Sequence, residues 1–238
     1  EGGYVGLGVL EISPDGHWLA YAGDRAGNER HALRFRDLRT GEESPETVPE
    51  VSYGFAWAAD SATCWYTVQD EASRPHRVLR HVVGNDPETD VEVFREDDER
   101  FHLHVAPARS QAVAVISAGS AITSESWLLD AHRPEADPEL VAAREQGVEY
   151  SVAHHPTGLL VVSNHDGAED FALWRAPPPA TPPPPPPEGG APPPPPAGRR
   201  PPSPPRRPPP RGSPAAPRGP PPAGVPPADL AALTAVCN

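Results

Sequence analysis

The chain has 238 residues, and 28 of its 37 prolines follow Arg175, so about 175 residues remain to build a packed core. Residues 1–175 contain 14 Arg against 31 acidic residues, a net charge of −17, whereas residues 176–238 contain 6 Arg against 2 acidic residues, a net charge of +4. An acidic surface repels nucleic acid and anionic membranes, so neither is expected as a partner, and a cation such as a basic peptide would complement it.

The first predicted element is a β-hairpin around residues 13–16. Residues 9–12 are a β-prone run, and the sequence SPDG that follows combines the fixed φ of Pro14 with the free φ of Gly16. The apolar pattern resumes at residues 18–21, and an alternating outer strand is expected at residues 32–38. The glycines of residues 2–8 do not follow the order of a phosphate-binding loop.

The same plan then recurs three times along the chain. Its further strands are expected at residues 55–58, 63–68, 77–82, 103–106, 113–117, 126–130, 150–153, 159–163 and 171–174. The turns at Asp15, Asp60, Arg109 and Thr157 are 45, 49 and 48 residues apart. A period of this length with about four strands per unit is typical of propeller blades.

The chain is therefore predicted to be all-β, with residues 1–176 forming a partial β-propeller of about four four-stranded antiparallel blades. A β-sandwich would also have many short strands, but it would not repeat hairpin, loop and outer strand in one order. If these blades form an isolated arc, the two terminal blades expose sheet faces and edges, so poor solubility or self-association is expected.

Several phrases in this part resemble one known family. They are LGVLEISPDG at residues 7–16, LRFRDLRTGE at 33–42, WAAD at 57–60, YT at 66–67, DE at 70–71, RP at 74–75, SESWLLD at 124–130, GVEY at 147–150 and HH at 154–155. In this order they resemble the amino-terminal propeller of oligopeptidase B, in the prolyl oligopeptidase group of serine peptidases. The resemblance covers about residues 1–176.

The resemblance implies a function and also a hydrolase domain that cannot be found in this sequence. Family members close seven blades, the total expected for this propeller too, over an α/β-hydrolase domain and cut short peptides after Arg or Lys. The implied role is gating, in which a narrow tunnel admits short basic peptides and excludes folded proteins. The implied partners are those peptides and the hydrolase domain in cis.

No catalytic residue is assigned, because the nucleophile elbow of the family cannot be found. G-x-S-x-G does not occur in the chain, and the nearest segment, residues 117–121 (SAGSA), lacks the flanking glycines that the strained turn needs. The chain alone is therefore predicted to be inactive, and no cofactor is expected. A non-enzymatic propeller scaffold with a proline-rich interaction tail is the alternative function.

Residues 177–238 form a proline-rich, low-complexity tail. This composition cannot bury enough apolar surface to offset an ordering entropy of ~1–2 kcal/mol per residue, so disorder with polyproline II character is expected. Residues 201–207 (PPSPPRR) match a P-x-x-P ligand. The abundance of Pro, Ala, Gly and Arg, whose codons begin with two G or C bases, favours a frame slip in a GC-rich gene over a linker or a ligand.

Four other features have a structural and a functional interpretation. His102 and His104 share a strand face and could bind a metal, but spacing identifies no third ligand. His154 and His155 are expected to be structural. The acidic run at residues 96–99 lacks calcium-loop spacing and is interpreted as a solvated loop between blades. The five tryptophans, at positions 18, 57, 65, 127 and 174, are assigned to packing between blades.

The cysteines and the apolar runs bear on location. Cys64 and Cys237 lie one in each part of the chain, without the spacing of a disulfide framework or a metal site. The longest apolar runs, such as residues 159–162, have only the length of a strand, so neither a signal peptide nor a membrane span is expected. Together these features predict a reducing, cytoplasmic compartment.

Overall fold

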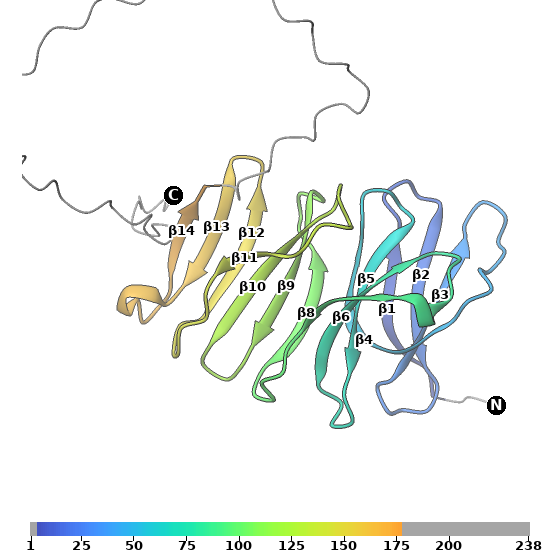
Figure 1. Cartoon of the computed structure of the whole chain (residues 1–238), viewed down its shortest axis with the longest axis horizontal. Coiled ribbons are helices and arrows are strands. Elements are labelled where there is room, and N and C mark those ends of the chain that lie inside the picture. The colour runs from blue at the N-terminus through green and yellow to red at the C-terminus, as the bar shows by residue number, and fades with distance from the viewer. Residues whose placement is uncertain (1–3, 178–238) are drawn as a thin grey trace, which may run out of the picture. The chain divides into compact units, whose positions relative to one another are not determined.

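The computed structural model describes residues 4–177, which fold into antiparallel β-sheets as predicted (Figure 1). The strands are β1 (Gly6–Ile12), β2 (Trp18–Asp24), β3 (His31–Asp37), β4 (Val48–Trp57), β5 (Thr63–Gln69), β6 (Pro75–Val82), β7 (Val91–Arg95), β8 (His102–Pro107), β9 (Val113–Gly119), β10 (Ser124–Asp130), β11 (Glu139–Ala142), β12 (Tyr150–His155), β13 (Gly158–Ser163) and β14 (Ala172–Ala176). Two single-turn helices, η1 (Pro87–Thr89) and η2 (His165–Gly167), lie in connections. Within residues 4–177 no helix has the length and apolarity that a membrane crossing requires.

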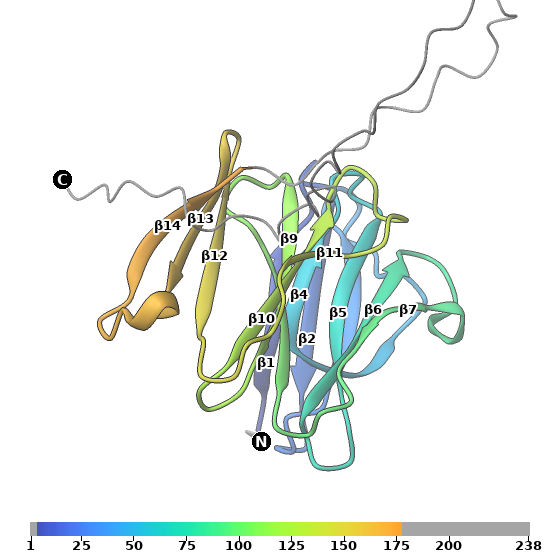
Figure 2. The same ribbon diagram turned by 60° about the vertical axis from the view of Figure 1, so that its left-hand side comes forward.

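The strands form four blades in chain order (Figure 2). Blade 1 contains β1, β2, β3 and the first residues of β4, and blade 2 contains the rest of β4 with β5, β6 and β7. Blade 3 contains β8 to β11, and blade 4 contains β12, β13 and β14. The disorder, frame slip and peptide ligand expected for the tail concern residues that lie outside the described ones.

Strand β4 belongs to two blades, which the repeat pattern did not predict. Its Val48 pairs with Leu33 of β3, and Val51 pairs with both His31 of β3 and Val68 of β5. Between them Glu50 adopts a left-handed conformation, with φ 58°. This residue redirects the strand without breaking it, so β1 to β7 form one continuous seven-stranded sheet.

Blade 4 also differs from the prediction, because it has three strands among the described residues rather than four. The residue that follows β14 is Pro177, and prolines also occupy the next two positions. Proline has no N–H to donate to a β-ladder, and β14 ends at Ala176, directly before Pro177. The prediction of four four-stranded blades therefore holds for blades 1 to 3 only.

The first three hairpin turns are built alike, at the places predicted. The N–H groups of Ser13, Ala58 and Ala108 each donate to the carbonyl five residues later, and each turn contains a residue with φ near +60° to +74°. In the third turn, Ser110 takes the position that Asp15 and Asp60 take in the first two turns. The prediction, which placed Arg109 there, was off by one residue. The fourth turn is tighter, since His155 pairs directly with Gly158.

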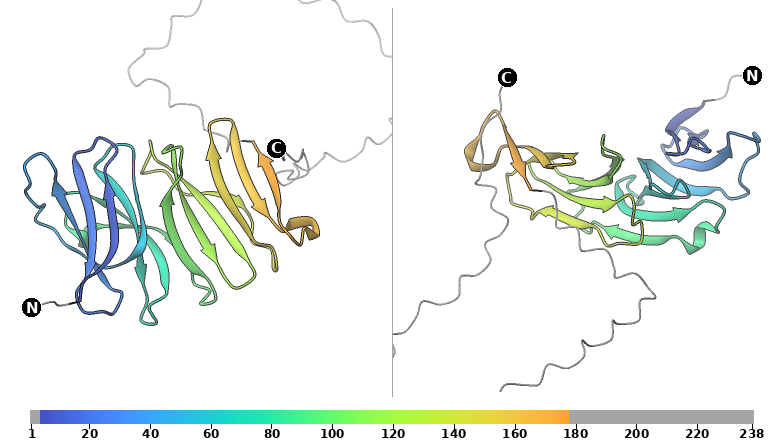
Figure 3. Two further views of the ribbon diagram at one scale, coloured as in Figure 1. Left: turned by 180° about the vertical axis from the view of Figure 1, so that it is seen from behind. Right: turned by 90° about the horizontal axis from the view of Figure 1, so that it is seen from above.

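The blades follow one another side by side along the chain (Figure 3), and apolar clusters join each blade to the next. The first includes Phe35 of blade 1 and Tyr66 of blade 2, the second Trp65 of blade 2 and Ile116 of blade 3, and the third Leu128 of blade 3 with residues of blade 4. All five tryptophans take part in these clusters, at positions 18, 57, 65, 127 and 174. Their assignment to packing between blades is confirmed.

Candidate functional site

We call β1, β4 and β8, the first strands of blades 1 to 3, the inner strands. Strands β4 and β8 approach each other closely. An added Cβ on Gly54 of β4 would lie 2.8 Å from the backbone nitrogen of Val105 in β8 and 2.8 Å from the Thr67 side chain. No contact between real Cβ atoms and their neighbours is that short, so only glycine fits there. Residues at the ends of β1, β4 and β8 line one hollow, which is the candidate site.

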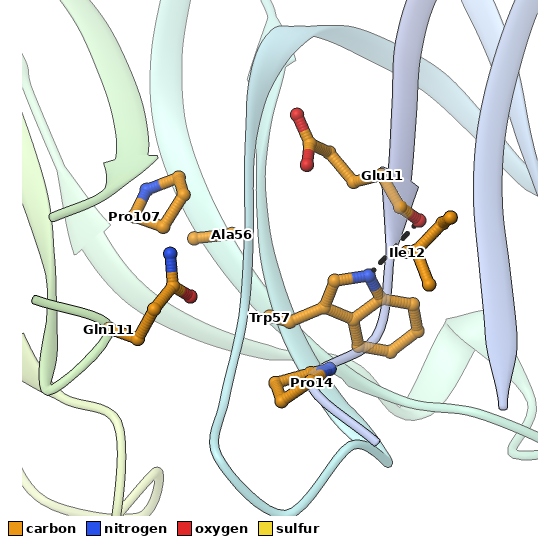
Figure 4. Close-up of a pocket in the computed structure, with 7 residues that line it drawn as sticks. All are labelled: Glu11, Ile12, Pro14, Ala56, Trp57, Pro107 and Gln111. Carbon is orange, nitrogen blue, oxygen red and sulfur yellow. Dashed lines mark hydrogen bonds between the residues drawn. The ribbon is translucent and has the colours of Figure 1, made fainter. Parts of the chain in front are cut away.

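The hollow has a volume of about 100 Å³ and lies where β1, β4 and β8 run into their turns. It is lined by Glu11, Ile12, Pro14, Ala56, Trp57, Pro107 and Gln111 (Figure 4). The indole nitrogen of Trp57 donates a hydrogen bond of 3.2 Å to the backbone carbonyl of Glu11. This bond ties the ring to β1 and leaves the Glu11 carboxylate exposed beside the hollow.

The chemistry of the hollow suits binding rather than catalysis. It offers one carboxylate from Glu11, one amide from Gln111 and walls of proline and tryptophan. A carboxylate beside an aromatic side chain is a suitable environment for a cation. The residues that line it include no Ser, Cys or His, so they supply no nucleophile with a neighbouring base.

The two histidines of β8 lie next to this region. His102 and His104 are both accessible to solvent, and desolvation by the neighbouring strands lowers the pKa of His104, which favours its neutral form. Within residues 4–177 no group of three or more His, Cys, Asp or Glu side chains is placed to hold a metal ion. The third ligand that spacing did not identify is thus not found in this part of the chain either.

The other histidine pair lies at the turn of blade 4. His154 is half-buried, and its Nδ1 lies 2.8 Å from Ser110 Oγ, so it connects the turn of blade 3 to blade 4. His155 is exposed, and its Nδ1 lies 2.9 Å from Thr157 Oγ1 within its own turn. These contacts agree with the structural role expected for both.

The segment nearest to a nucleophile elbow is part of a hairpin. Residues 117–119 end strand β9, and Ser120 Oγ donates a hydrogen bond of 3.1 Å to the carbonyl of Thr123 in the turn before β10. An elbow places its serine between a strand and a helix, and here a strand follows. Ser120 therefore has a structural role in this hairpin.

The acidic run at residues 96–99 connects blades 2 and 3 as expected, but it is not fully solvated. Glu96 is buried and paired with the guanidinium of Arg144, which also bonds Glu125 and lies 3.6 Å from the centre of the Phe101 ring. Arg144 is 48 residues further along the chain, so local composition gave no sign of this pair. The interpretation as a solvated loop is wrong for Glu96.

Arg74 fixes the same loop from its other side. Its Nε donates to Asp70 Oδ2 at 2.9 Å, and its Nη1 donates to the carbonyls of Glu96, Asp98 and Phe101 at 3.0 to 3.3 Å. The side chain is almost fully buried. One arginine therefore satisfies three loop carbonyls and one carboxylate.

A buried ionic cluster between blades 1 and 2 had no signal in the sequence. His81 Nδ1 lies 2.7 Å from Asp90 Oδ1, its Nε2 lies 3.7 Å from Glu46 Oε1, and Phe35 stacks on its ring. Tyr66 donates a hydrogen bond of 2.8 Å to the other oxygen of Asp90. Burial, and then this bond, raise the pKa of Tyr66, so the phenol keeps its proton.

Glu46 remains ionised in this cluster. Burial raises its pKa, but hydrogen bonds from Ser44 Oγ and from the N–H of Gly84 outweigh this effect and leave the pKa below its ordinary value. Glu46 precedes β4, whereas His81 ends β6. The cluster therefore fastens the connection between blades 1 and 2.

Comparison with known proteins agrees with the fold and with the resemblance seen in the sequence. The family described as "Prolyl oligopeptidase, N-terminal beta-propeller domain" matches residues 1–183. "Protease 2" of Moraxella lacunata is 34% identical over 179 residues, which cover 74% of this chain and 26% of the relative. "Dipeptidyl aminopeptidase BI" of Pseudoxanthomonas mexicana is 34% identical over 175 residues, which cover 73% of this chain and 24% of the relative.

Solved structures give the same result. Oligopeptidase B from Leishmania major superposes with a TM-score of 0.70 and 27% identity, covering 73% of this chain and 25% of that one. Oligopeptidase B from Trypanosoma brucei superposes with a TM-score of 0.66 and 28% identity, covering 72% and 24%. The chain thus spans about a quarter of the length of these relatives. It belongs to the prolyl oligopeptidase family, of whose N-terminal β-propeller it forms a portion.

Proposed function

We propose that this chain is the propeller portion of an oligopeptidase-B-like serine endopeptidase, and that it gates short basic peptides which a hydrolase domain in cis cleaves after Arg or Lys. The observation that carries the proposal is the match of residues 1–183 to the propeller of this peptidase family. The chain itself contains no G-x-S-x-G motif, so its contribution is selection rather than bond cleavage.

Two features of the chain support selection for basic peptides. Residues 1–175 carry a net charge of −17, which attracts cations over a distance of about a Debye length, ~8 Å at physiological salt. On the inner strands, the exposed Glu11 carboxylate lies beside the hollow at Trp57 and Gln111. A basic side chain on a passing extended peptide would fit this combination of charge and aromatic surface.

A chimera tests the proposal. Residues 4–177 would replace the matching propeller segment of Leishmania major oligopeptidase B, and turnover would be measured on short peptides with Arg or with a neutral residue and on a folded protein. Cleavage of the short Arg peptides without cleavage of the folded protein is expected. A folded chimera that cleaves both equally well would contradict gating by this propeller.

Within the chimera, Glu11→Gln tests the role of the hollow. Loss of one exposed carboxylate should raise KM for the Arg peptide about 1.4- to fivefold, because exposed ion pairs contribute roughly 0.2–1 kcal/mol, and should leave KM for the neutral peptide unchanged. Glu99→Gln is the matched control, since Glu99 is an exposed carboxylate in the loop between β7 and β8. An equal effect of both substitutions would show that only the overall charge matters.

A further measurement separates the peptidase from the alternative function, a scaffold with a proline-rich interaction tail. The purified 238-residue chain should show no turnover on an Arg-containing chromogenic dipeptide that a serine reagent blocks. It should also bind SH3 and WW domains no better than a scrambled Pro/Arg peptide does. Tight, sequence-dependent binding through residues 201–210 would favour the scaffold instead.

A further inference from the structure

The buried ionic cluster between blades 1 and 2 contains two carboxylates and one imidazole. The side chains of Glu46, His81 and Asp90 are 5%, 0% and 3% exposed. Among the residues that the structure describes, no arginine lies within ion-pair distance of Glu46 or Asp90. His81 is therefore the side chain that can set a positive charge against these two buried carboxylates.

The other groups that face the His81 ring are uncharged. Cys64 of β5 pairs with His81 in the strand register, and burial raises the pKa of its thiol well above the ordinary value, so it keeps its proton. The Tyr66 phenol, also from β5, keeps its proton as well. Strand β3 contributes the Phe35 ring, which stacks on the imidazole with 5.3 Å between the ring centres. The charge balance of the cluster therefore depends on the two carboxylates and on His81.

Each nitrogen of the His81 ring faces a carboxylate oxygen. Nδ1 lies 2.7 Å from Asp90 Oδ1, and Nε2, which has no hydrogen-bond partner, lies 3.7 Å from Glu46 Oε1. A neutral imidazole has one N–H and one lone pair, whereas an imidazolium has two N–H groups. With its N–H on Nδ1, toward Asp90, a neutral ring would turn the lone pair of Nε2 toward the Glu46 carboxylate. The arrangement therefore suits the protonated ring on both sides.

We propose that His81 is a proton-operated clasp between blades 1 and 2. As an imidazolium it holds Glu46, which lies two residues before β4, against the end of β6. As the pH rises, the Nε2–H bond breaks and its proton passes to water, while Nδ1–H stays on Asp90. The Glu46 carboxylate then faces a lone pair in a buried place, and the connection into β4 opens. Because the closed form binds one proton more than the open form, the opening constant should rise with pH, by at most tenfold per pH unit.

Two neighbouring backbone amides report the state of this clasp. The N–H of Gly84 donates to Glu46 Oε1 at 2.7 Å, whereas the N–H of Val83 donates to the carbonyl of Ala62 at 2.9 Å and serves as the internal reference. Exchange of both amides with water would be measured by NMR in the 238-residue chain between about pH 6 and pH 9, and divided by the intrinsic rate at each pH. The protection of Gly84 relative to Val83 should fall at least about tenfold over this range.

Glu46→Gln should abolish this pH dependence. The amide oxygen of the glutamine can still accept from Gly84, and its NH₂ group can donate to the lone pair of Nε2, so the neutral His81 ring no longer opposes a charge. The ratio of the two protections should then stay constant over the same range. Glu42→Gln is the matched control, because Glu42 is an exposed carboxylate in the same connection, and it should behave like the wild type.

Nitrogen-15 chemical shifts of the imidazole show the proton directly. The His81 signals, identified by their absence from the His81→Gln chain, should show two N–H groups at the acid end of the range and loss of the Nε2 proton where Gly84 loses protection. A ring whose number of N–H groups does not change between about pH 6 and pH 9 would overturn the proposal. So would equal changes at Gly84 and Val83, or a Glu46→Gln chain that keeps the wild-type pH dependence.

Discussion

At the scale of single residues, the structure depends on a few positions where space or charge permits one residue type. Gly54 is such a position, because Thr67 and the backbone of Val105 occupy the place of its missing Cβ. Gly8 is another, since a Cβ there would lie 2.7 Å from the buried ring of His31. Gly54 thus lets blades 2 and 3 approach closely, whereas Gly8 makes room for the His31 ring within blade 1.

Gly54→Ala should therefore destabilise the protein. Because the added methyl group meets backbone on one side, the inner strands must separate, and overpacking of this kind costs about 1–3 kcal/mol. Urea unfolding followed by tryptophan fluorescence measures the change. Gly119→Ala is the control, because an added Cβ at Gly119 meets nothing within 4 Å. An equal loss for both variants would assign the effect to strand propensity instead.

Protonation of Asp37 in acid should also lower the free energy of unfolding. A hydrogen bond from His17 at 2.9 Å, together with N–H bonds from Arg39 and Thr40, lowers the pKa of Asp37 to about 2. A lowered pKa in the folded state means that the contribution of Asp37 is complete above its ordinary pKa of 3.8 and is lost as the pH falls toward 2.

Asp37→Asn should remove this part of the pH dependence. The difference in Tm between wild type and variant should be constant above about pH 4 and should shrink between pH 4 and pH 2. Thermal unfolding at half-unit steps of pH measures it. A difference that does not change over this range would show that Asp37 titrates normally.

The histidines show which site residues a sequence can reveal. Alternation along a strand placed His102 and His104 on one face, because two neighbours in a strand are fixed by local geometry. The contacts of His81 with Asp90 and Glu46 could not be predicted in this way. They depend on how the connection into β4 crosses the end of β6, which is a tertiary relation without a local pattern.

At the scale of elements, hairpins were predictable and their joining was not. The turns were found because Pro, Gly, Asp and Ser act on the backbone within four residues. The shared strand β4 was not found, because a left-handed Glu50 has no compositional signal and its pairing depends on β3 and β5. The fourth strand of blade 4 was wrongly expected because the other blades have one.

The loop between β7 and β8 depends on Arg74. Arg74→Met should cost about 3 kcal/mol, because it removes the guanidinium that donates to Asp70 Oδ2 and to three loop carbonyls. Arg95→Met is the control, since Arg95 forms an exposed pair with Glu92 and such pairs contribute roughly 0–1 kcal/mol. Equal unfolding midpoints in urea for the two variants would show that the loop carbonyls find other donors.

At the scale of the whole described molecule, the protection of backbone amides from hydrogen exchange should decrease from β5 toward blade 4. Every residue of β5 is buried, whereas β14 pairs on one side only among the described strands. Hydrogen exchange should be slowest in residues 63–69 and at least about 100-fold faster in residues 172–176. Equal rates would mean that all four blades open together.

The strand that blades 1 and 2 share limits how this propeller can be rearranged. A recombination event that copies or exchanges one blade must cut the chain between blades. Cuts at residues 96–101 or 143–149 fall in connections between separate sheets, so blades 3 and 4 can be exchanged as cassettes. A cut at residue 50 would divide β4 and leave half a strand on each side. Blades 1 and 2 can therefore be exchanged only together, and a designer who grafts this propeller should move them as one segment.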